Sequence, residues 1–471
     1  MEKSDQKSHS CVPIGKGLHF GTDAGTLGNT LFLDGSDGTM REQKAMEDII
    51  FSSLDGIDLD RYIVSTYALE IDRSADAHAV AREIAIGQTT GTWVPVPEET
   101  DEIRRKHVGR VVGIYEAPHF EREIPPTMDN RHLIVQIAIP CVNLEPQIPK
   151  LLSTIAGNDI TVTHRLKLLD IRFPEDFVKV FQGAKFGIPG IRELLDVRER
   201  PLVVNMIKPC VGLSPRAGAA LFYQAALGGV DVVKDDEVLA NTSFSSIAAR
   251  VKACMAKEKE AFEKTGEHTL YAVNITDEVN RVKEHAYRVI EHRGNCVMLN
   301  YLPTGISALR MLAEDPSINV PILAHLDLSA SFFGAPDSGI SAALVLGKLP
   351  RLAGGDMVIY PSPYGKFLFL RESHLRVAQL QRAPFYHLKP IFPAPSGGVH
   401  AGNVAPVIRD LGYDCMIGVG GGIHGHKMGA AAGARSVRQA IDAVMKGIPL
   451  EEAANEHEEL AVAIQSWGLT S

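Results

Sequence analysis

A run of four charged residues, Lys234-Asp235-Asp236-Glu237, directly follows the short apolar run Val230 to Val233. Four adjacent charges cannot all be buried unpaired, because removing a charge from water is costly. A solvated loop with internal ion pairs would explain an isolated run of this kind. At the end of a barrel strand, however, two carboxylates offer hard oxygen ligands that suit Mg²⁺. Lysine is cationic and becomes an Mg²⁺ ligand only if it is converted to an anionic carbamate.

Two glycine clusters, Ser396-Gly397-Gly398 and Gly420-Gly421-Gly422, each follow an apolar run near the end of the chain. Backbone N–H groups that no side chain covers can bind a phosphate, helped by the N-terminus of a following helix. Tight turns alone would also explain the glycines. Two clusters after adjacent strands favour a phosphate site.

Three single residues could take part in catalysis. Lys208 ends an apolar run, and partial burial could lower its pKa into the range of a general acid or base; pairing with a carboxylate is the alternative. His325 is either a structural or a catalytic histidine. Lys366 lies between Pro361 and Phe367 in a loop rich in proline and glycine. It is either a mobile cation that closes over an anionic substrate or a solvated loop lysine.

The elements that must position these residues are strands of a β/α barrel. From about residue 201, eight short apolar runs alternate with helical stretches, as a closed (β/α)8 TIM barrel requires. Near-continuous apolar runs are typical of parallel strands buried on both faces. Reactive groups in such barrels lie at the carboxyl ends of the strands. The predicted strands are residues 202–207, 230–233, 270–273, 296–299, 322–324, 357–360, 388–392 and 415–419.

The rest of the chain divides into two further segments. Residues 1–42 are predicted to be a Gly-rich N-terminal extension, either loop-like or a lid over a neighbouring site. Residues 43–176 show the order strand-helix-strand-strand-helix-strand, which indicates an N-terminal ferredoxin-like α+β domain. Residues 177–471 are then the C-terminal barrel that carries the metal and phosphate sites. The predicted fold class is therefore α/β.

Composition excludes several classes of protein. The 471 residues are 45% hydrophobic and 22% charged, which is ordinary for a globular enzyme. The net charge of −9 does not favour binding to nucleic acid, and no apolar run is long enough to span a membrane. The six cysteines are scattered and form no CxxC pair, which predicts reduced thiols and a cytoplasmic protein.

The string Gly228 to Glu237 resembles the activation motif of the RuBisCO large chain. Further matches follow in chain order and extend over about residues 58 to 450. Together these motifs are highly specific. They are Thr90-Gly-Thr-Trp93, Gly157-Asn158, Phe181-Gln-Gly183, Ile207-Lys-Pro209, Gly212-Leu-Ser214, Ala353-Gly-Gly-Asp356 and Gly365-Lys366, together with the two glycine clusters.

This resemblance implies roles for the residues above. Lys234 would be carbamylated by CO₂, and the carbamate would hold Mg²⁺ together with Asp236 and Glu237. Lys208 would move the proton that forms an enediolate. Asn158 would reach the site from the partner chain of a head-to-tail homodimer, whose active sites lie at the subunit interface. The substrate and its phosphate would be held by Thr92, Ser396, Gly397, Gly398, Gly420 and Gly421.

Four departures from the family pattern bear on function. Cys210 replaces a second lysine, Leu326 replaces the arginine that grips a second phosphate, and Ile359 replaces a histidine near it. Gly87 replaces the glutamate that positions the loop lysine. A phosphate dianion needs charge-assisted donors, so ribulose bisphosphate should bind poorly. The chain thus resembles the non-carboxylating, form IV type RuBisCO-like proteins.

The resulting functional prediction is an Mg²⁺-dependent enzyme that forms an enolate from a monophosphorylated keto sugar or keto sugar acid. The preferred reaction is decarboxylation of a substrate like 3-oxo-isoapionate 4-phosphate. The alternatives are an isomerase or enolase of a methylthio-sugar phosphate, a non-catalytic regulatory protein, and a true carboxylase. Cys210 and the missing arginine oppose the last of these.

Overall fold

The computed structural model describes residues 50–91, 96–162 and 164–470. The predicted extension, residues 1–42, and the predicted substrate ligand Thr92 lie outside these residues. Within them, no helix combines the length and the hydropathy that crossing a membrane requires.

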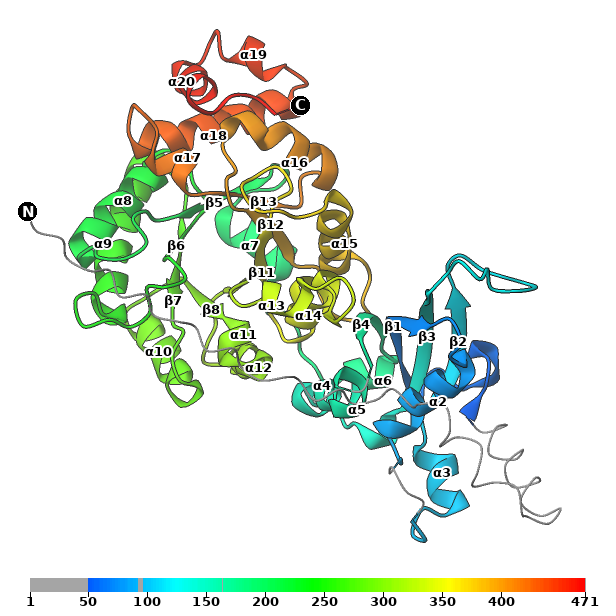
Figure 1. Cartoon of the computed structure of the whole chain (residues 1–471). Coiled ribbons are helices and arrows are strands. Elements are labelled where there is room, and N and C mark those ends of the chain that lie inside the picture. Colours follow the sequence, from blue (N-terminus) through cyan, green and yellow to red (C-terminus); the bar gives the residue numbers. More distant parts are fainter. Residues whose placement is uncertain (1–49, 92–95, 163, 471) are drawn as a thin grey trace, which may run out of the picture. The chain divides into compact units, whose positions relative to one another are not determined.

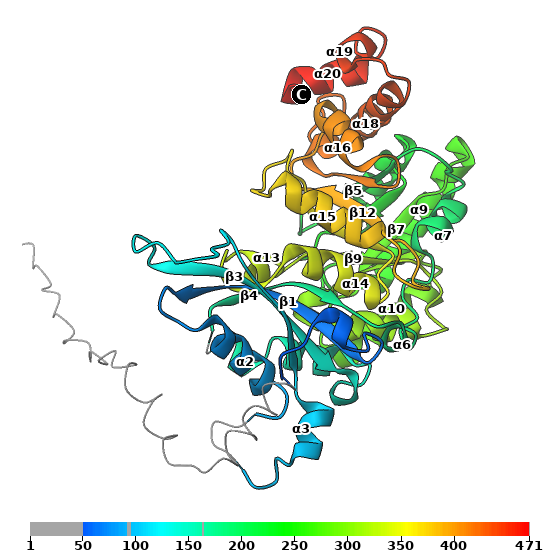
Figure 2. The same ribbon diagram turned by 90° about the vertical axis from the view of Figure 1, so that its right-hand side faces the viewer.

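The N-terminal part of the described chain is built on an antiparallel sheet in the order β4-β1-β3-β2. Along β1 most side chains are buried, since β1 lies between β3 and β4. Helix α2 packs on this sheet through β2 and β3 (Figure 2). The arrangement confirms the predicted ferredoxin-like order, to which the short helices α3 and α5 are added. The elements are β1 (Tyr62–Asp72), α2 (Ala77–Gly87), α3 (Asp101–His107), β2 (Arg110–Glu116), β3 (Asn130–Pro140), α4 (Ile148–Ile155), α5 (Asn158–Thr161) and β4 (Leu166–Arg172).

A fifth strand of this sheet comes from the barrel half of the chain. β10 (Gly339–Ile340) pairs in parallel with β4, and Gly339 lies opposite Lys167. The following Ser341 continues the contact, because its hydroxyl donates to the carbonyl of Leu169 over 2.7 Å. A strand of two residues is too short to show the alternation of buried and exposed side chains, so the sequence pattern does not predict it.

The C-terminal part is an eight-stranded parallel barrel, as predicted, with helices on its outer face (Figure 1). Neighbouring strands follow the order β12-β11-β9-β8-β7-β6-β5-β13. Amphipathic helices alternate with the strands; the first three are α8 (Pro215–Leu227), α9 (Ile247–Thr265) and α10 (Val279–Glu291). The strands are β5 (Leu202–Met206), β6 (Val232–Lys234), β7 (Leu270–Asn274), β8 (Cys296–Asn300), β9 (Ile322–His325), β11 (Met357–Pro361), β12 (Phe392–Ser396) and β13 (Met416–Val419).

The barrel has one seam without ladder hydrogen bonds, between β12 and β13. These strands are neighbours, because a Cβ on Gly418 would lie 2.5 Å from the Cβ of Ser396. The N–H of Phe392 points to β11 and donates to the carbonyl of Asp356, so the alternate positions 393 and 395 face β13. Both are proline and have no N–H to donate.

The start of β12 differs from the prediction. The strand begins at Phe392 rather than at Leu388. Leu388 closes a turn by donating its N–H to the carbonyl of Phe385, and Pro390 has no N–H for a ladder. Apolar character alone therefore placed the predicted strand four residues too early.

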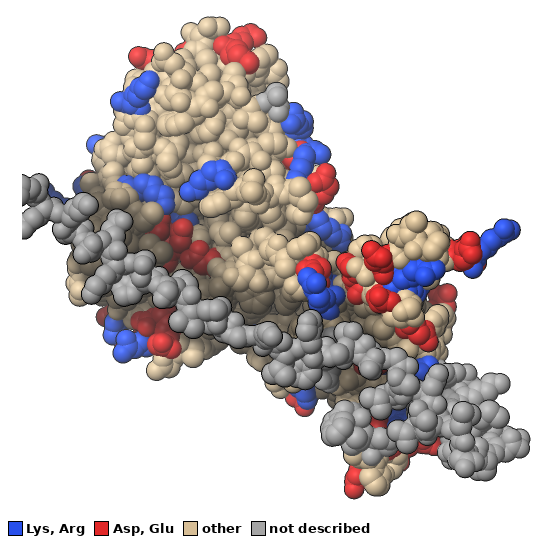
Figure 3. Space-filling model, viewed as in Figure 1, with Lys and Arg blue, Asp and Glu red and all other residues tan. Residues whose placement is uncertain are grey.

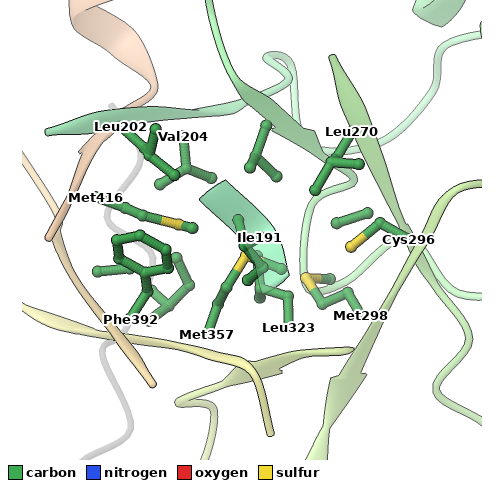
Figure 4. Packing of buried hydrophobic residues seen from close by; sticks show 14 of the residues in the cluster. Ile191, Leu202, Val204, Leu270, Cys296, Met298, Leu323, Met357, Phe392 and Met416 are labelled. Atoms are coloured by element: carbon green, nitrogen blue, oxygen red, sulfur yellow. The ribbon is translucent and has the colours of Figure 1, made fainter. Parts of the chain in front are cut away.

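The barrel interior is filled by apolar side chains from all eight strands (Figure 4). Leu323, Met357 and Met416 are fully buried there. Helix α7 (Gly187–Leu195) contributes Ile191 to the same cluster and lies across the amino-terminal end of the strands. The interior is thus a packed core, which leaves the opposite end for chemistry.

Asp356 joins α7 to this scaffold. Its Oδ1 accepts the N–H groups of Phe186 and Gly187, and its Oδ2 accepts the N–H of Ile322, each over 2.8 Å. Burial raises the pKa of Asp356 to about 6, although the three backbone hydrogen bonds oppose this increase. The carboxylate is therefore ionised at pH 7.5.

Asp356→Asn is expected to destabilise the fold by about 1–3 kcal/mol, because an amide NH₂ would face the N–H of Ile322 and leave it unpaired. Thermal unfolding at pH 7.5 should show a clearly lower melting temperature. Asp58→Asn is the control, since that side chain is 59% exposed, and it should leave the melting temperature unchanged. Equal melting of the two variants would contradict the assigned role of Asp356.

Candidate active site

The predicted catalytic residues gather at the carboxyl ends of the barrel strands. Lys234 and His325 are the last residues of β6 and β9, and Lys208 follows β5 by two residues. In parallel strands these ends share one rim of the barrel. Seen from this rim, acidic and basic side chains lie in the hollow at the centre of the barrel (Figure 3).

Lys234 is fully buried, with 0% of its side chain exposed. Its Nζ donates to the carbonyl of Asp235 over 2.9 Å and to Oε2 of Glu237 over 3.0 Å. Burial alone would raise the pKa of Glu237, but the ammonium of Lys234 and the ring of His325 lower it to about 2. The Glu237 carboxylate therefore carries its charge at any physiological pH.

Lys208 pairs with the second predicted metal ligand. Its Nζ lies 2.5 Å from Oδ2 of Asp236 and 3.1 Å from Sγ of Cys210. Burial would lower the pKa of Lys208, but the bonds to Asp236 and Cys210 outweigh it and raise the pKa. The structure thus shows the carboxylate-paired lysine that the sequence left as an alternative, rather than a lysine of lowered pKa.

The remaining carboxylate of the charged run, Asp235, belongs to the scaffold. It accepts the Tyr271 hydroxyl over 2.6 Å, Nε of Arg250 over 3.1 Å and the N–H of Asn274 over 3.0 Å. Asp235 is 1% exposed. These contacts hold the run at the end of β6 and leave Asp236 and Glu237 to face the barrel mouth.

Two asparagine amides fix the backbone of the run. Nδ2 of Asn274 donates to the carbonyls of Asp236 and Glu237, and Nδ2 of Asn300 donates to that of Glu237 over 2.9 Å. Oδ1 of Asn300 is buried and has no hydrogen-bond partner within the part of the chain that the structure describes.

His325 lies between two carboxylates. Its Nε2 is 3.5 Å from Oε2 of Glu237, and its Nδ1 is 3.5 Å from Oδ1 of Asp327. Ligand atoms from these three residues lie within 4.8 Å of one another, a spacing that could hold a metal ion. The group shares Glu237 with the predicted Lys234, Asp236 and Glu237 set, and His325 and Asp327 extend the acidic cluster toward β9.

The two glycine clusters form a cradle of free backbone N–H groups at the β12–β13 seam. Gly397 and Gly398 have φ of +90° and +96°, which residues with a Cβ rarely adopt. Gly421 and Gly422 open the short helix α17 (Gly421–His424). Among the described residues, the N–H groups of these four glycines donate to no protein acceptor. Free backbone donors on two neighbouring strand ends suit a phosphate.

The loop with Lys366 lies against this cradle. The N–H of Lys366 donates to the carbonyl of Gly397 over 2.7 Å. The Lys366 side chain is exposed, and its Nζ lies over the ring of Phe367, 5.0 Å from the centroid. Gly365 packs so closely that a Cβ there would meet the Gly397 carbonyl at 1.9 Å.

The two positions where the family pattern has groups of a second phosphate site carry apolar residues. Leu326, which stands where the family pattern has an arginine, packs against the barrel core cluster. Ile359 is a member of that cluster and is 1% exposed. Neither side chain offers a donor to a second phosphate.

One further predicted ligand, Asn158, lies away from the barrel strands. It is the first residue of α5 in the N-terminal part and is exposed. Its predicted role toward a partner chain therefore stays a prediction.

Asp327 and Asn300 are site residues that the sequence analysis did not single out. Asp327 lies two residues after His325 and Asn300 ends β8, so their positions at strand ends could have identified both as site residues.

The comparisons with known proteins agree with this geometry. The family model of the ribulose bisphosphate carboxylase large chain, catalytic domain, matches residues 187–467, and that of its N-terminal domain matches residues 53–177. The chain therefore belongs to the RuBisCO large-chain family.

Similar relatives include RuBisCO-like proteins. A ribulose bisphosphate carboxylase-like protein of Archaeoglobus fulgidus is 50% identical, over 87% of this chain and 94% of the relative. A 2,3-diketo-5-methylthiopentyl-1-phosphate enolase of Geobacillus thermodenitrificans is 38% identical, over 86% and 98%. The crystal structure of a rubisco-like protein (MtnW) from Alicyclobacillus acidocaldarius is 40% identical with a TM-score of 0.79, over 86% and 100%.

Proposed function

We propose that this protein is an Mg²⁺-dependent enolase that acts on a monophosphorylated diketone with an apolar end. One observation carries the proposal: the barrel combines a lysine-carboxylate cluster, one cradle of free glycine N–H groups, and an apolar wall, Leu326 and Ile359, where the family pattern has groups of a second phosphate site. The first supports proton transfer, the second binds one phosphate, and the third disfavours a second phosphate.

The carboxylates of the site fit a divalent cation. Asp236 and Glu237 each bind a lysine ammonium, so two positive charges already lie where the ligands converge. With Lys234 as a carbamate formed with CO₂, the three residues would supply the oxygen ligands that Mg²⁺ prefers. When bound, the ion would stabilise the negative charge that develops on a ketone oxygen of the substrate.

Lys208 would transfer the proton once Mg²⁺ is bound, because the ion would compete with the lysine for Asp236, whose bond helps to raise the lysine pKa. Nζ of Lys208 binds Asp236, and a Cβ on Gly420 would be only 3.5 Å from the lysine Cε, beside the cradle. A phosphorylated substrate held by the cradle would therefore present its adjacent carbons to this amine. Removing a proton from carbon and returning one to oxygen converts the ketone to its enol, with no net loss of atoms. His325, between Glu237 and Asp327, would bind a substrate oxygen.

The choice of enolase over decarboxylase rests on the apolar wall and on one of the relatives. The decarboxylation of a 3-oxo-isoapionate 4-phosphate-like substrate was preferred from the sequence because Lys366 and both glycine clusters indicated a polar substrate. The apolar wall and the name of the Geobacillus relative instead favour the methylthio-sugar alternative.

We further propose the homodimer that the family resemblance implies, in which Asn158 would reach the partner's site.

The test is a comparison of three reactions with one protein preparation, supplied with MgCl₂ and bicarbonate. The protein should enolise 2,3-diketo-5-methylthiopentyl 1-phosphate, detected by deuterium exchange from solvent and by the absorbance of the enol. It should fix no labelled CO₂ with ribulose bisphosphate, because Leu326 provides no donor to the second phosphate. Labelled phosphoglycerate would overturn the proposal, and faster CO₂ release from 3-oxo-isoapionate 4-phosphate would restore the decarboxylase.

A further inference from the structure

The loop between β11 and α15 (Arg371–Arg382) is anchored at Tyr364, two residues before Lys366. The Tyr364 hydroxyl donates to Oδ2 of Asp410 over 2.6 Å, and Nδ2 of Asn403 donates to the Tyr364 carbonyl over 2.9 Å. Asp410 and Asn403 lie in or beside α16 (Val404–Leu411). The loop is therefore anchored to the helix that follows the first glycine cluster.

Asp410 is a strong acceptor for this anchor. Its side chain is fully buried, and Nη2 of Arg371 also binds it at 2.5 Å. Burial would raise the pKa of Asp410, but the bonds from Arg371 and Tyr364 lower it. A hydroxyl that donates to a buried, ionised carboxylate makes one of the stronger hydrogen bonds in proteins.

The anchored loop also determines the direction of two peptide groups. Ser362 donates its N–H to the carbonyl of Ser396 over 2.8 Å, and Lys366 donates to the carbonyl of Gly397 over 2.7 Å. A trans peptide is planar, so its C=O and N–H point in opposite directions. The N–H groups of Gly397 and Gly398 belong to these same two peptides and therefore point away from the loop.

We infer that Tyr364 is a positioning residue for the phosphate cradle: its bond to Asp410 holds the loop that aims the Gly397 and Gly398 N–H groups at the anion. The inference rests on the proposed phosphate site. Without the anchor, glycine peptides with φ near +90° would lose the two bonds that select one orientation. The same loop carries Lys366, so its position would follow as well.

The test measures the affinity of the Mg²⁺-loaded protein for inorganic phosphate by calorimetry, together with hydrogen exchange of the loop and cradle amides. Tyr364→Phe should weaken phosphate binding by about tenfold, as expected for loss of a bond to a charged group, and should speed exchange over residues 362–370. Asp410→Asn leaves a neutral acceptor and should give a smaller loss. Tyr386→Phe is the control, since its hydroxyl binds the Phe173 carbonyl elsewhere, and it should bind phosphate like the wild type.

The outcomes separate the two proposals. If Tyr364→Phe and Asp410→Asn bind phosphate as tightly as the wild type, the anchoring role is overturned while the phosphate site stands. If the wild type binds no phosphate, the phosphate site of the proposed function is refuted, and so is this inference. Unchanged melting temperatures of the variants would show that lost affinity is not lost folding.

Discussion

Replacement of Lys234 by methionine is expected to lower kcat for enolisation by at least about 1,000-fold. Methionine fills much of the same fully buried space but offers no amine that CO₂ could convert to a carbamate. The oxygen ligand set would then lose one member, and a Lewis-acid ion supplies several kcal/mol, at 1.4 kcal/mol for each factor of ten. Deuterium exchange into the diketone at saturating Mg²⁺ and bicarbonate is the measurement.

A matched control is available in Lys185, a partly buried lysine outside the site. Its Nζ donates to the backbone carbonyls of Asp315 and Ile318, so Lys185→Met removes comparable bonds without touching the mouth. The wild type should also gain activity on preincubation with bicarbonate, and Lys234→Met should not. Full activity of Lys234→Met would refute both the carbamate and the proposed ligand set.

Lys208→Met is expected to reduce solvent-proton exchange by about 100- to 10,000-fold, the range that general acid–base catalysis contributes. Phosphate affinity should stay near that of the wild type, because the cradle consists of backbone N–H groups that this change does not remove. Exchange by mass spectrometry and phosphate binding by calorimetry, on the same variant, separate chemistry from binding.

Cys210→Ser is the control for Lys208, because a hydroxyl keeps a hydrogen-bonding group within reach of the lysine amine. Its exchange rate should stay within a few-fold of the wild type. If Lys208→Met exchanged protons at the wild-type rate, the transfer would belong to another group of the site, with His325 between its two carboxylates the first to test.

Most of the barrel was predictable because buried parallel strands are nearly continuous apolar runs, and seven of the eight begin within two residues of the expected position. β12 was not, since Leu388 is apolar but lies in a turn that backbone hydrogen bonds define. β10 was not, because two residues have no period and their pairing with β4 depends on a contact over 170 residues away in sequence.

The site was predictable where chemistry follows directly from strand ends. Lys208 meets Asp236 because β5 and β6 are adjacent and parallel. The family resemblance left Asp235 out of the metal ligands without giving it a role, and only the packing of Arg250 and Tyr271 shows that Asp235 belongs to the scaffold. Tyr364 and Asp410 were missed because a bond across 46 residues leaves no local pattern.

The proline seam between β12 and β13 separates recognition from chemistry in this barrel. The charged cluster is carried by strands within the continuous ladder β5 to β9, where a shift of one strand would break hydrogen bonds. The two glycine clusters instead flank the seam, where a change in spacing costs no ladder bond. During evolution, substitutions that widen or narrow the seam would alter substrate preference while the proton-transfer residues keep their places. The same barrel would then accommodate new substrates through changes in the spacing between β12 and β13 alone.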